Sequence, residues 1–238
     1  HNQNSTVVPS FGGNNTDLNL SNADLDLLIL MPSPWLTGFM SINYDDAPLN
    51  VVSNNTVSNS RLYLDDAFIT LGNFAYSPFY FTIGQNYVPF GRYSSSFISK
   101  SLPKILGKTI GRTVLLGYDR PSSNTLYGAV YVLNGDSYTV NSSSVSNGGM
   151  NVGYRCKLTY ADMGIKNDLG ISWIANIADS VAMQNNDFPA PLFGGFGSAA
   201  HGSEQLMHRV PAIDLRWRFS VNDQVSLINE YVVTTRAF

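Results

Sequence analysis

The sequence is poor in charged residues, which make up 13% of its 238 positions. An average soluble globular domain carries roughly 25%. Aromatic residues, in contrast, make up 12% of the chain. Few charges and many aromatic side chains argue against an ordinary cytosolic enzyme and against a disordered chain. The net charge of −3 leaves no general basic footprint for nucleic acid.

Cysteine and long apolar runs are also scarce. Cys156 is the single cysteine, so the chain can form no internal disulfide and no zinc site built on several thiolates. No run of about 18 apolar residues occurs, and this excludes a transmembrane helix. Helical spacing with capping residues is hard to find. The regular structure expected from the sequence is therefore β-structure.

An apolar pattern with period two runs through almost the whole chain and predicts strands. The clearest case is 212–219, where Ile213, Leu215 and Trp217 alternate with charged residues. Turn or loop signals separate ten such segments. They are 18–30, 35–44, 62–71, 79–88, 112–118, 126–134, 151–160, 169–177, 212–219 and 225–234.

Such alternation fits either a soluble sandwich with an apolar core or an outer-membrane barrel with its apolar face toward lipid. Three features favour the barrel. Strands of about 9–11 residues match the bilayer thickness. Short and long connections alternate along the chain, as periplasmic turns and extracellular loops do. Aromatic residues lie near strand ends, as interfacial girdles require; they are Trp35, Tyr44, Tyr118, Tyr160, Phe219 and Tyr231. We predict an all-β fold, an antiparallel transmembrane β-barrel formed as a single domain by 1–238.

The order of the connections also predicts a direction. If the long loops 46–60, 89–111, 135–149 and 178–210 are extracellular, the first strand runs inward and the tenth runs outward. His1 and Phe238 would then lie on the side of the long loops, whereas bacterial barrels normally keep both termini in the periplasm. We expect an internal piece of a larger barrel, with strands missing at both ends.

A short motif connects the chain to known porins. The segment 84–92, Gly-Gln-Asn-Tyr-Val-Pro-Phe-Gly-Arg, resembles a strand end in phosphate- and carboxylate-selective porins, although Tyr87 stands where those families usually have lysine. Together with 67–91 and 230–238, the chain resembles the LbtU-type siderophore porins. This resemblance implies an outer-membrane barrel with a lumenal path for a ferric polycarboxylate siderophore. It transfers no individual binding residue.

The distribution of charge gives an independent indication of anion passage. Between Ala67 and Tyr118 the chain has no acidic residue, yet it has five basic ones. Rings of lysine and arginine select anions, because low-dielectric walls focus their field. The predicted anion path consists of Arg92, Lys100, Lys104, Lys108, Arg112, Arg155, Lys157, Arg216 and Arg218. The alternative is a solvated basic loop that binds lipopolysaccharide phosphates.

Other candidate sites receive structural interpretations. The acids Asp24, Asp26, Asp65, Asp66, Asp214 and Glu230 are expected to pair with lumenal arginines rather than to act in acid–base catalysis. His201, Ser203 and His208 lie in the longest loop without a recognised metal or hydrolase spacing. Cys156 is expected to be a small apolar side chain. We therefore expect no metal, no cofactor and no enzyme activity.

The sequence as a whole predicts an outer-membrane channel or receptor for an anionic ferric siderophore. Its expected partners are outer-membrane lipid, lipopolysaccharide and the small anionic solute. A general anion-selective porin for phosphate or carboxylate is the nearest alternative. Two alternatives of another class stay open, an outer-membrane enzyme and a soluble β-rich surface module.

Overall fold

The computed structural model describes residues 22–46, 60–93, 101–122, 124–137, 139–140, 146–160, 163–184, 196, 206–221 and 225–238. Within these residues ten antiparallel strands form one sheet, in which each strand pairs with its neighbours in sequence. The strands are β1 (Asn22–Leu30), β2 (Leu36–Asp46), β3 (Ser60–Gly72), β4 (Phe79–Tyr87), β5 (Ile110–Asp119), β6 (Thr125–Asn134), β7 (Ser146–Tyr160), β8 (Met163–Ile174), β9 (Ala212–Val221) and β10 (Val225–Thr234). The all-β, antiparallel class and the ten predicted strands are confirmed. As described, the sheet is open, with β1 and β10 at its edges.

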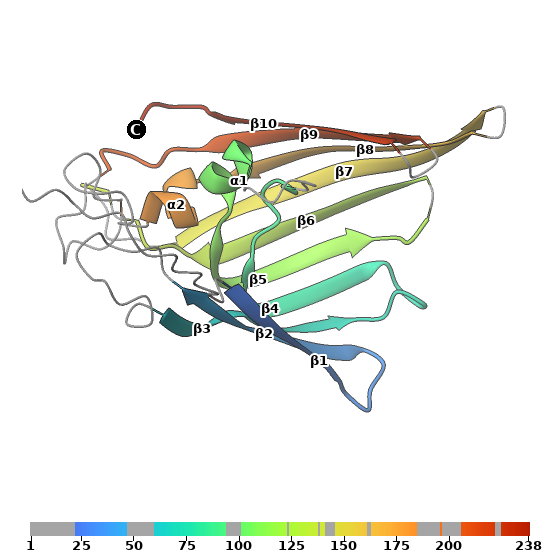
Figure 1. The fold of residues 1–238 in the computed structure, drawn as a ribbon, viewed down its shortest axis with the longest axis horizontal. Helices are drawn as coiled ribbons and strands as arrows, with labels where there is room; N and C mark the ends of the chain where they lie inside the picture. The colour runs from blue at the N-terminus through green and yellow to red at the C-terminus, as the bar shows by residue number, and fades with distance from the viewer. Residues whose placement is uncertain are drawn as a thin grey trace, which may run out of the picture.

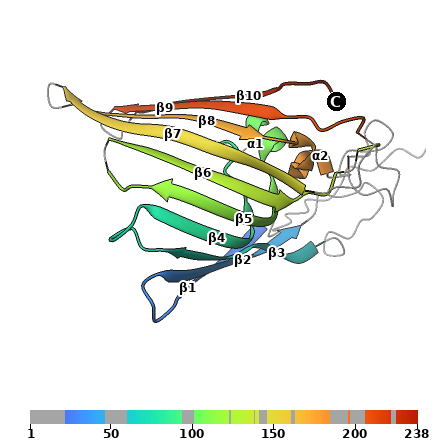
Figure 2. The same ribbon diagram turned by 180° about the vertical axis from the view of Figure 1, so that it is seen from behind.

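The sheet curves around two short helices (Figures 1 and 2). These are α1 (Leu102–Gly107) and α2 (Val181–Gln184), and a 3₁₀ turn, η2 (Ile177–Asp179), precedes α2. Both helices lie at the end of the sheet where the tenth strand leaves toward Phe238 (Figure 1). We call this the loop end, because the long connections join strands there, and the opposite end the turn end. The position of Phe238 at the loop end agrees with the expected strand directions, whereas His1 lies outside the described residues.

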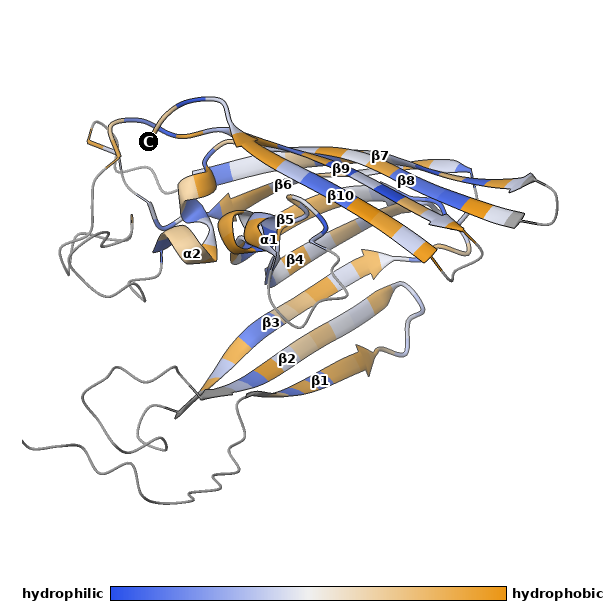
Figure 3. Cartoon of the chain, turned by 45° about the horizontal axis from the view of Figure 1, so that its top comes forward, coloured by the Kyte–Doolittle hydropathy of each residue, from blue (hydrophilic) through white to orange (hydrophobic). Residues whose placement is uncertain are grey.

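The two faces of the sheet have opposite character, and the banding of the strands in Figure 3 follows from this. One face carries exposed apolar side chains on every strand except β2, whose apolar side chains are half-buried; we call it the apolar face. Its exposed members include Leu25, Leu27, Ile69, Leu71, Phe81, Ile83, Val114, Leu116, Val130, Val132, Val152, Leu169, Ile171, Leu215, Trp217, Leu227 and Tyr231. The other face, the polar face, buries hydrophilic side chains against α1 and the segments that cross it. They include Ser41, Asn43, Thr82, Asn86, Thr113, Thr125, Asn151, Asp168, Ser172, Asp214, Arg216 and Ser220.

The predicted orientation of β9 agrees with these faces. Leu215 and Trp217 are exposed on the apolar face, whereas Asp214 and Arg216 are buried on the polar face. Arg218 follows at the next alternate position and lines a cavity on the polar side. The period-two pattern of this strand therefore gave its register correctly, because one residue of slip would exchange the two sets.

The boundaries of two predicted strands were wrong by three residues or more. β8 begins at Met163 and ends at Ile174, not at 169 and 177. Asn167 occupies an apolar-face position, where it accepts a hydrogen bond from the Trp217 indole at 3.3 Å. Because this polar residue interrupts the alternation, the start of the strand was not recognised. Ile177 leaves the strand because it is buried in the 3₁₀ turn. β7 is longer than predicted and starts at Ser146, since its first residues are small and polar.

The buried apolar residues form a small core at the loop end, on the polar side of the sheet. Phe90, Ile174, Leu206 and Val210 are almost completely inaccessible there. The Asp179 carboxylate is buried beside them and accepts hydrogen bonds from Ser137 Oγ and Asn147 Nδ2, both at 2.7 Å. These bonds fasten the start of the connection after β6 to η2.

Among the described residues, no helix is long and apolar enough to cross a membrane.

Gly84, the first residue of the porin-like motif, is required by its backbone. Its φ of +143° is one that other residues rarely adopt. A Cβ at this position would collide with the carbonyl oxygen of Ala67 and with Cα of Phe68 on β3. The glycine thus allows β4 to approach β3 closely just before the chain leaves the sheet. Thr113 on β5 lies opposite and donates to the Gly84 carbonyl oxygen at 3.4 Å.

Candidate functional site

The residues that follow β4 do not continue along the sheet but cross its polar face; we call residues 88–93 the inner segment. Asn151 Nδ2 on β7 donates to the carbonyl oxygen of Pro89 at 2.8 Å. The Gly91 N–H donates to Ser172 Oγ on β8 at 3.3 Å. The segment therefore extends from β4 past β7 to β8.

The far end of the inner segment is held by Glu230 on β10. The Arg92 N–H donates to Glu230 Oε1 at 2.7 Å, and the Tyr93 N–H donates to Oε2 at 3.0 Å. One carboxylate thus binds two successive backbone amides. Positive φ angles at Gly91 (76°) and Tyr93 (48°) turn the backbone so that these amides point the same way. A carboxylate that accepts several N–H groups makes strong, charge-assisted hydrogen bonds.

Glu230→Gln should release the inner segment. An amide has one acceptor oxygen in place of two charged ones, so at least one of the two backbone amides loses its partner. We expect faster proteolysis at 91–93 than for the parent protein. Asn229→Gln, an uncharged change at the neighbouring position on the apolar-face side of β10, serves as the control. Equal proteolysis of E230Q and the parent protein would contradict the role given to this carboxylate.

Burial keeps the Tyr93 hydroxyl in its neutral form. The side chain is largely covered, and its hydroxyl approaches Gly107 at the end of α1. Burial, and then the negative charges of Asp214 and Glu230, raise the pKa of Tyr93 above its ordinary value. The hydroxyl therefore stays protonated at all physiological pH values and remains available as a donor on the inner segment.

Arg92 is the centre of the candidate site. Its guanidinium forms an ion pair with Asp168 on β8, yet half of the side chain, 51%, stays exposed. The side chain takes part in the lining of three cavities on the polar side of the sheet. A guanidinium that pairs with a carboxylate through one Nη group and is otherwise exposed can donate its remaining N–H groups to an anion.

The first cavity, of about 200 Å³, lies toward the loop end; we call it the loop-side cavity. Three basic residues, Arg92, Lys104 and Lys108, line it together with Tyr87 and Tyr93, and its lining contains no acidic residue. Pro103 lies in the first turn of α1, and the helix places Lys104 in its last turn with Lys108 directly after it.

Tyr87 fixes the position of Lys108 in the loop-side cavity. The Lys108 Nζ lies 3.7 Å from the centroid of the Tyr87 ring, a cation–π contact. The Tyr87 hydroxyl in turn donates to Asp65 Oδ1 at 2.5 Å. Tyr87 thus connects Lys108 to Asp65 on β3.

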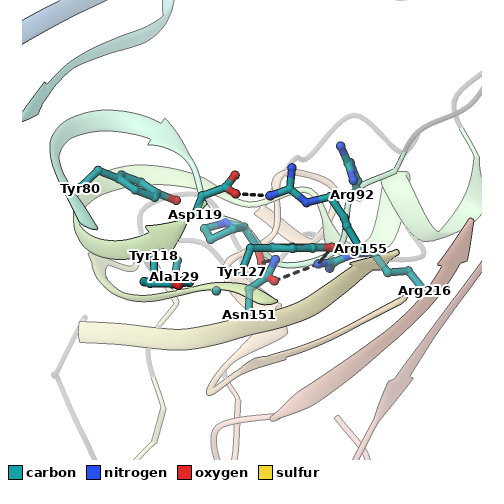
Figure 4. A pocket seen from close by; sticks show the side chains of 12 residues that line it. Tyr80, Arg92, Tyr118, Asp119, Tyr127, Ala129, Asn151, Arg155 and Arg216 are labelled. Atoms are coloured by element: carbon teal, nitrogen blue, oxygen red, sulfur yellow. Dashed lines mark hydrogen bonds and ion pairs between the residues drawn. The ribbon is translucent and has the colours of Figure 1, made fainter. Parts of the chain in front are cut away.

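The second cavity, of about 220 Å³, lies in the middle of the polar face (Figure 4). Arg155 forms an ion pair with Asp119 and lies 4.7 Å above the Tyr127 ring. Arg216 donates to Ser172 Oγ at 2.9 Å and to Asn151 Oδ1 at 2.8 Å. Because Arg216 is buried and bonded to the wall, it acts as a structural residue here. Arg155 keeps a third of its side chain exposed.

The third cavity, of about 340 Å³, lies toward the turn end; we call it the turn-side cavity. It is the most strongly basic of the three. Its charged lining residues are Arg92, Arg155, Lys157, Lys166, Arg218 and the single acid Asp168, and Ser122 and Ser220 add hydroxyl groups. Arg92 and Arg155 also line the middle cavity, so the two cavities adjoin at these side chains.

Most of the predicted anion path is brought together on the polar face, with three exceptions. Arg92, Lys104, Lys108, Arg155, Lys157 and Arg218 line these cavities. Arg216 lines the middle cavity, but its two Nη groups donate to the wall. Arg112 alternates with Thr113 and so shares the side of the sheet with Val114 and Leu116; it belongs to the apolar face near the loop end. Lys100 lies outside the described residues.

Sequence reasoning missed Lys166 and Asp168, because the start of β8 was not recognised. Both lie on the polar face, where Asp168 pairs with Arg92. The signal was the alternation of Ile165, Lys166, Asn167, Asp168 and Leu169, which the polar Asn167 interrupted. The expectation that lumenal acids pair with arginines is confirmed for Asp214, whose Oδ1 lies 3.7 Å from Arg216 Nη1.

Candidates for other chemistry find no supporting geometry in the described part of the chain. His208 is exposed there, whereas His201 and Ser203 lie outside it. No group of three or more histidine, cysteine, aspartate or glutamate side chains within the described ranges could hold a metal ion. Cys156 is partly exposed and belongs to the apolar-face positions of β7.

Comparisons with known proteins find relatives in two bacterial genera. The chain is 33% identical over 231 residues to a UPF0422 protein of Coxiella burnetii. The matched region covers 95% of this chain and 44% of that protein. It is 34% identical over 231 residues to a UPF0422 protein of Legionella pneumophila strain Philadelphia 1, of which it covers 42%. The chain thus spans less than half the length of these relatives. No family model matches it, and no solved structure matches it.

Proposed function

We propose that the chain forms part of the wall of an outer-membrane β-barrel that passes small anions, and that its cargo is an anionic ferric siderophore. One observation carries this proposal. The inner segment crosses the polar face and brings Arg92 into one cavity with Lys104 and Lys108, which come from a different part of the chain. A narrow part of a channel that is lined by basic and no acidic side chains acts as an anion filter.

The inverted polarity of the sheet supports a membrane location. An exposed apolar surface that extends over nine of the ten strands is far larger than the few hundred Å² that soluble monomers normally expose. A soluble module would turn these side chains inward, but the inward face here is polar and basic. Lipid is the partner that covers such a face at no desolvation cost, and the relatives come from Gram-negative bacteria, which have an outer membrane.

Closure of the barrel requires more strands than the ten seen here. Within hydrocarbon, unpaired backbone groups at the edges β1 and β10 would each be unsatisfied, and so an open sheet cannot stand in a bilayer. We propose that further strands of a larger barrel pair with both edges. In this arrangement the loop end is extracellular and the loop-side cavity is the first basic site that an incoming anion meets.

A general anion-selective porin is the second candidate. Both functions need the same basic lumen, and they differ in whether a large chelate is retained. The fixed inner segment favours a selective path over a wide pore, because Glu230 and Ser172 hold it across the face. Transport rather than catalysis is proposed, since Asp168 and Asp119 are both engaged by arginines.

Full-length protein, which includes the strands proposed to close the barrel, tests the proposal in planar bilayers. Under a tenfold KCl gradient, we expect a reversal potential that lies between zero and the equilibrium potential of chloride, which indicates a preference for chloride. Added ferric citrate, a simple ferric polycarboxylate, should reduce the chloride current in a concentration-dependent way. A channel with cation preference, or a folded protein without any conductance, would contradict anion passage. A chloride current that ferric citrate leaves unchanged would favour the general porin.

A further inference from the structure

We infer that Asp214 on β9 and Glu230 on β10 hold one proton between them, and that this proton keeps the inner segment in place on the polar face. Asp214 lies opposite Val232 in the register of the two strands, and Glu230 lies opposite Arg216. The two acids are therefore diagonal neighbours on one face of the sheet. Their carboxyl groups come within hydrogen-bonding reach of each other. The inference concerns the way the inner segment is held and does not require that the chain transports an anion.

The Asp214 carboxyl lacks the donors that an ionised acid needs. The residue is completely buried, with an exposed fraction of 0%. No N–H or O–H group among the described residues donates a hydrogen bond to either of its oxygens. Arg216 Nη1 lies 3.7 Å from Oδ1, which is too long for a hydrogen bond, and the two Nη groups of this arginine donate to Ser172 and Asn151. A buried carboxylate that keeps its charge is normally surrounded by donors, so burial favours the neutral form of Asp214.

Glu230 is the acid of the pair that keeps its charge. Its two oxygens accept from the backbone N–H groups of Arg92 and Tyr93, at 2.7 and 3.0 Å. A neutral carboxyl group would be the weaker acceptor for these amides. Two carboxylates in contact in a buried site cannot both stay ionised. The pair therefore carries one negative charge, on Glu230, and one proton, on Asp214, whose O–H donates to Glu230.

The groups around the pair favour a single negative charge. Arg216 on β9 faces both acids. Tyr93 on the inner segment lies beside them, and Tyr131 on β6 lies beside Tyr93. The small cavity next to Glu230 adds three charged side chains, Arg92, Asp168 and Arg218. Arginines stay charged and tyrosines stay neutral between about pH 5 and pH 8, so of these groups only the carboxyls can change charge in this range.

The shared proton makes the position of the inner segment depend on pH. When the segment leaves the polar face, both acids meet water and lose their protons above about pH 5, as ordinary carboxyl groups do. The docked form then holds one proton more than the released form. Raising the pH therefore favours release, by at most about tenfold per pH unit, until the docked form also loses its proton. As a consequence that rests on the proposed function, the filter would be held in mildly acidic medium and loosened in alkaline medium.

Hydrogen–deuterium exchange of the full-length protein in phospholipid vesicles tests the inference at the backbone amides of 91–93. Exchange rates are corrected for the intrinsic pH dependence of exchange. In the parent protein, we expect the protection of these amides to fall at least about tenfold between pH 5 and pH 8. Asp214→Asn should hold the protection at the parent's pH 5 level, to within about twofold, because the asparagine N–H donates to Glu230 without titrating. Asp24→Asn, at an exposed position on β1, is the matched control and should keep the parent pH dependence.

Infrared spectroscopy detects the proton itself, because the C=O stretch of a neutral carboxyl group is separated from the carboxylate bands. At about pH 6, where carboxyl groups in water are ionised, the parent protein and D24N should show one more neutral carboxyl group than D214N. This measurement does not depend on the motion of the inner segment.

The outcomes separate this inference from the proposed function. Loss of protection in D214N at pH 5 would show that Asp214 acts as the ionised partner of Arg216, and it would overturn the shared proton. Parent protection that does not change between pH 5 and pH 8, or an unchanged neutral carboxyl band in D214N, would overturn it too, even if bilayers show an anion channel. Protection that depends on pH in the parent but not in D214N, in a protein without conductance, would support the proton site and contradict the proposed channel.

Discussion

Replacing Lys104 and Lys108 by glutamate should turn the chloride preference of the channel into a potassium preference. Both lysines line the loop-side cavity with Arg92, and its lining holds no acid. The double change converts three positive charges into one positive and two negative charges. In a narrow site with low-dielectric walls, a few charges dominate the potential that an ion meets. We expect the chloride-to-potassium permeability ratio to fall at least tenfold, measured as a reversal potential under a KCl gradient.

Two matched changes elsewhere control for total charge. Arg120 and Arg236 are exposed, and neither lines the three cavities. R120E/R236E alters the net charge by the same amount and should leave the permeability ratio within twofold of the parent value. If K104E/K108E folds and keeps the parent ion preference, the basic residues of α1 belong to a solvated outer loop, and the anion filter must be assigned to other residues.

The fold could be predicted to the level of strands and faces, because the two faces of such a strand require apolar and polar residues at alternate positions. β9 carries this pattern without interruption, and its boundaries were predicted within two residues. The pattern fails where a polar side chain finds a partner on the apolar face. Asn167, bonded to the Trp217 indole, is such a case, and with it the start of β8 was lost.

The site could be predicted only as a set of basic residues, not as an arrangement. Sequence separations do not reveal that Arg92 meets Asp168, 76 positions later, or that Glu230 binds the backbone of the inner segment. These contacts depend on the curvature of the whole sheet. Arg112 shows the opposite difficulty, because its charge suggested the lumen while its alternation with Thr113 assigns it to the other face.

The inner segment links the two halves of the proposal, a barrel wall and a filter. It covers Ser172 and Asp168, which are buried on the polar face, and so it turns part of that face into a packed surface. The same segment exposes the Arg92 side chain toward both the loop-side and the turn-side cavities. A single arginine, anchored by Asp168, would thus be passed by every anion that moves between these two cavities.

Leu215→Arg should destabilise the inserted protein by about 2–4 kcal/mol, the range for an arginine at the middle of the hydrocarbon layer. Leu215 lies in the interior of β9 on the apolar face, and 47% of it is exposed. The effect depends on lipid as the neighbour, because an arginine on a water-facing surface is nearly neutral for stability. Urea unfolding in phospholipid vesicles measures the free energy.

Leu158→Arg provides the depth control for this prediction. Leu158 lies on the same face, is 57% exposed and stands near the turn end of β7, where the aromatic girdle and the headgroups are expected. Its replacement by arginine should cost only about 0–1 kcal/mol, because the guanidinium can reach the interface. A large loss at Leu215 with a small loss at Leu158 is the signature of a bilayer. If both arginines leave the free energy of unfolding unchanged, the apolar face does not contact lipid, and the membrane assignment is wrong.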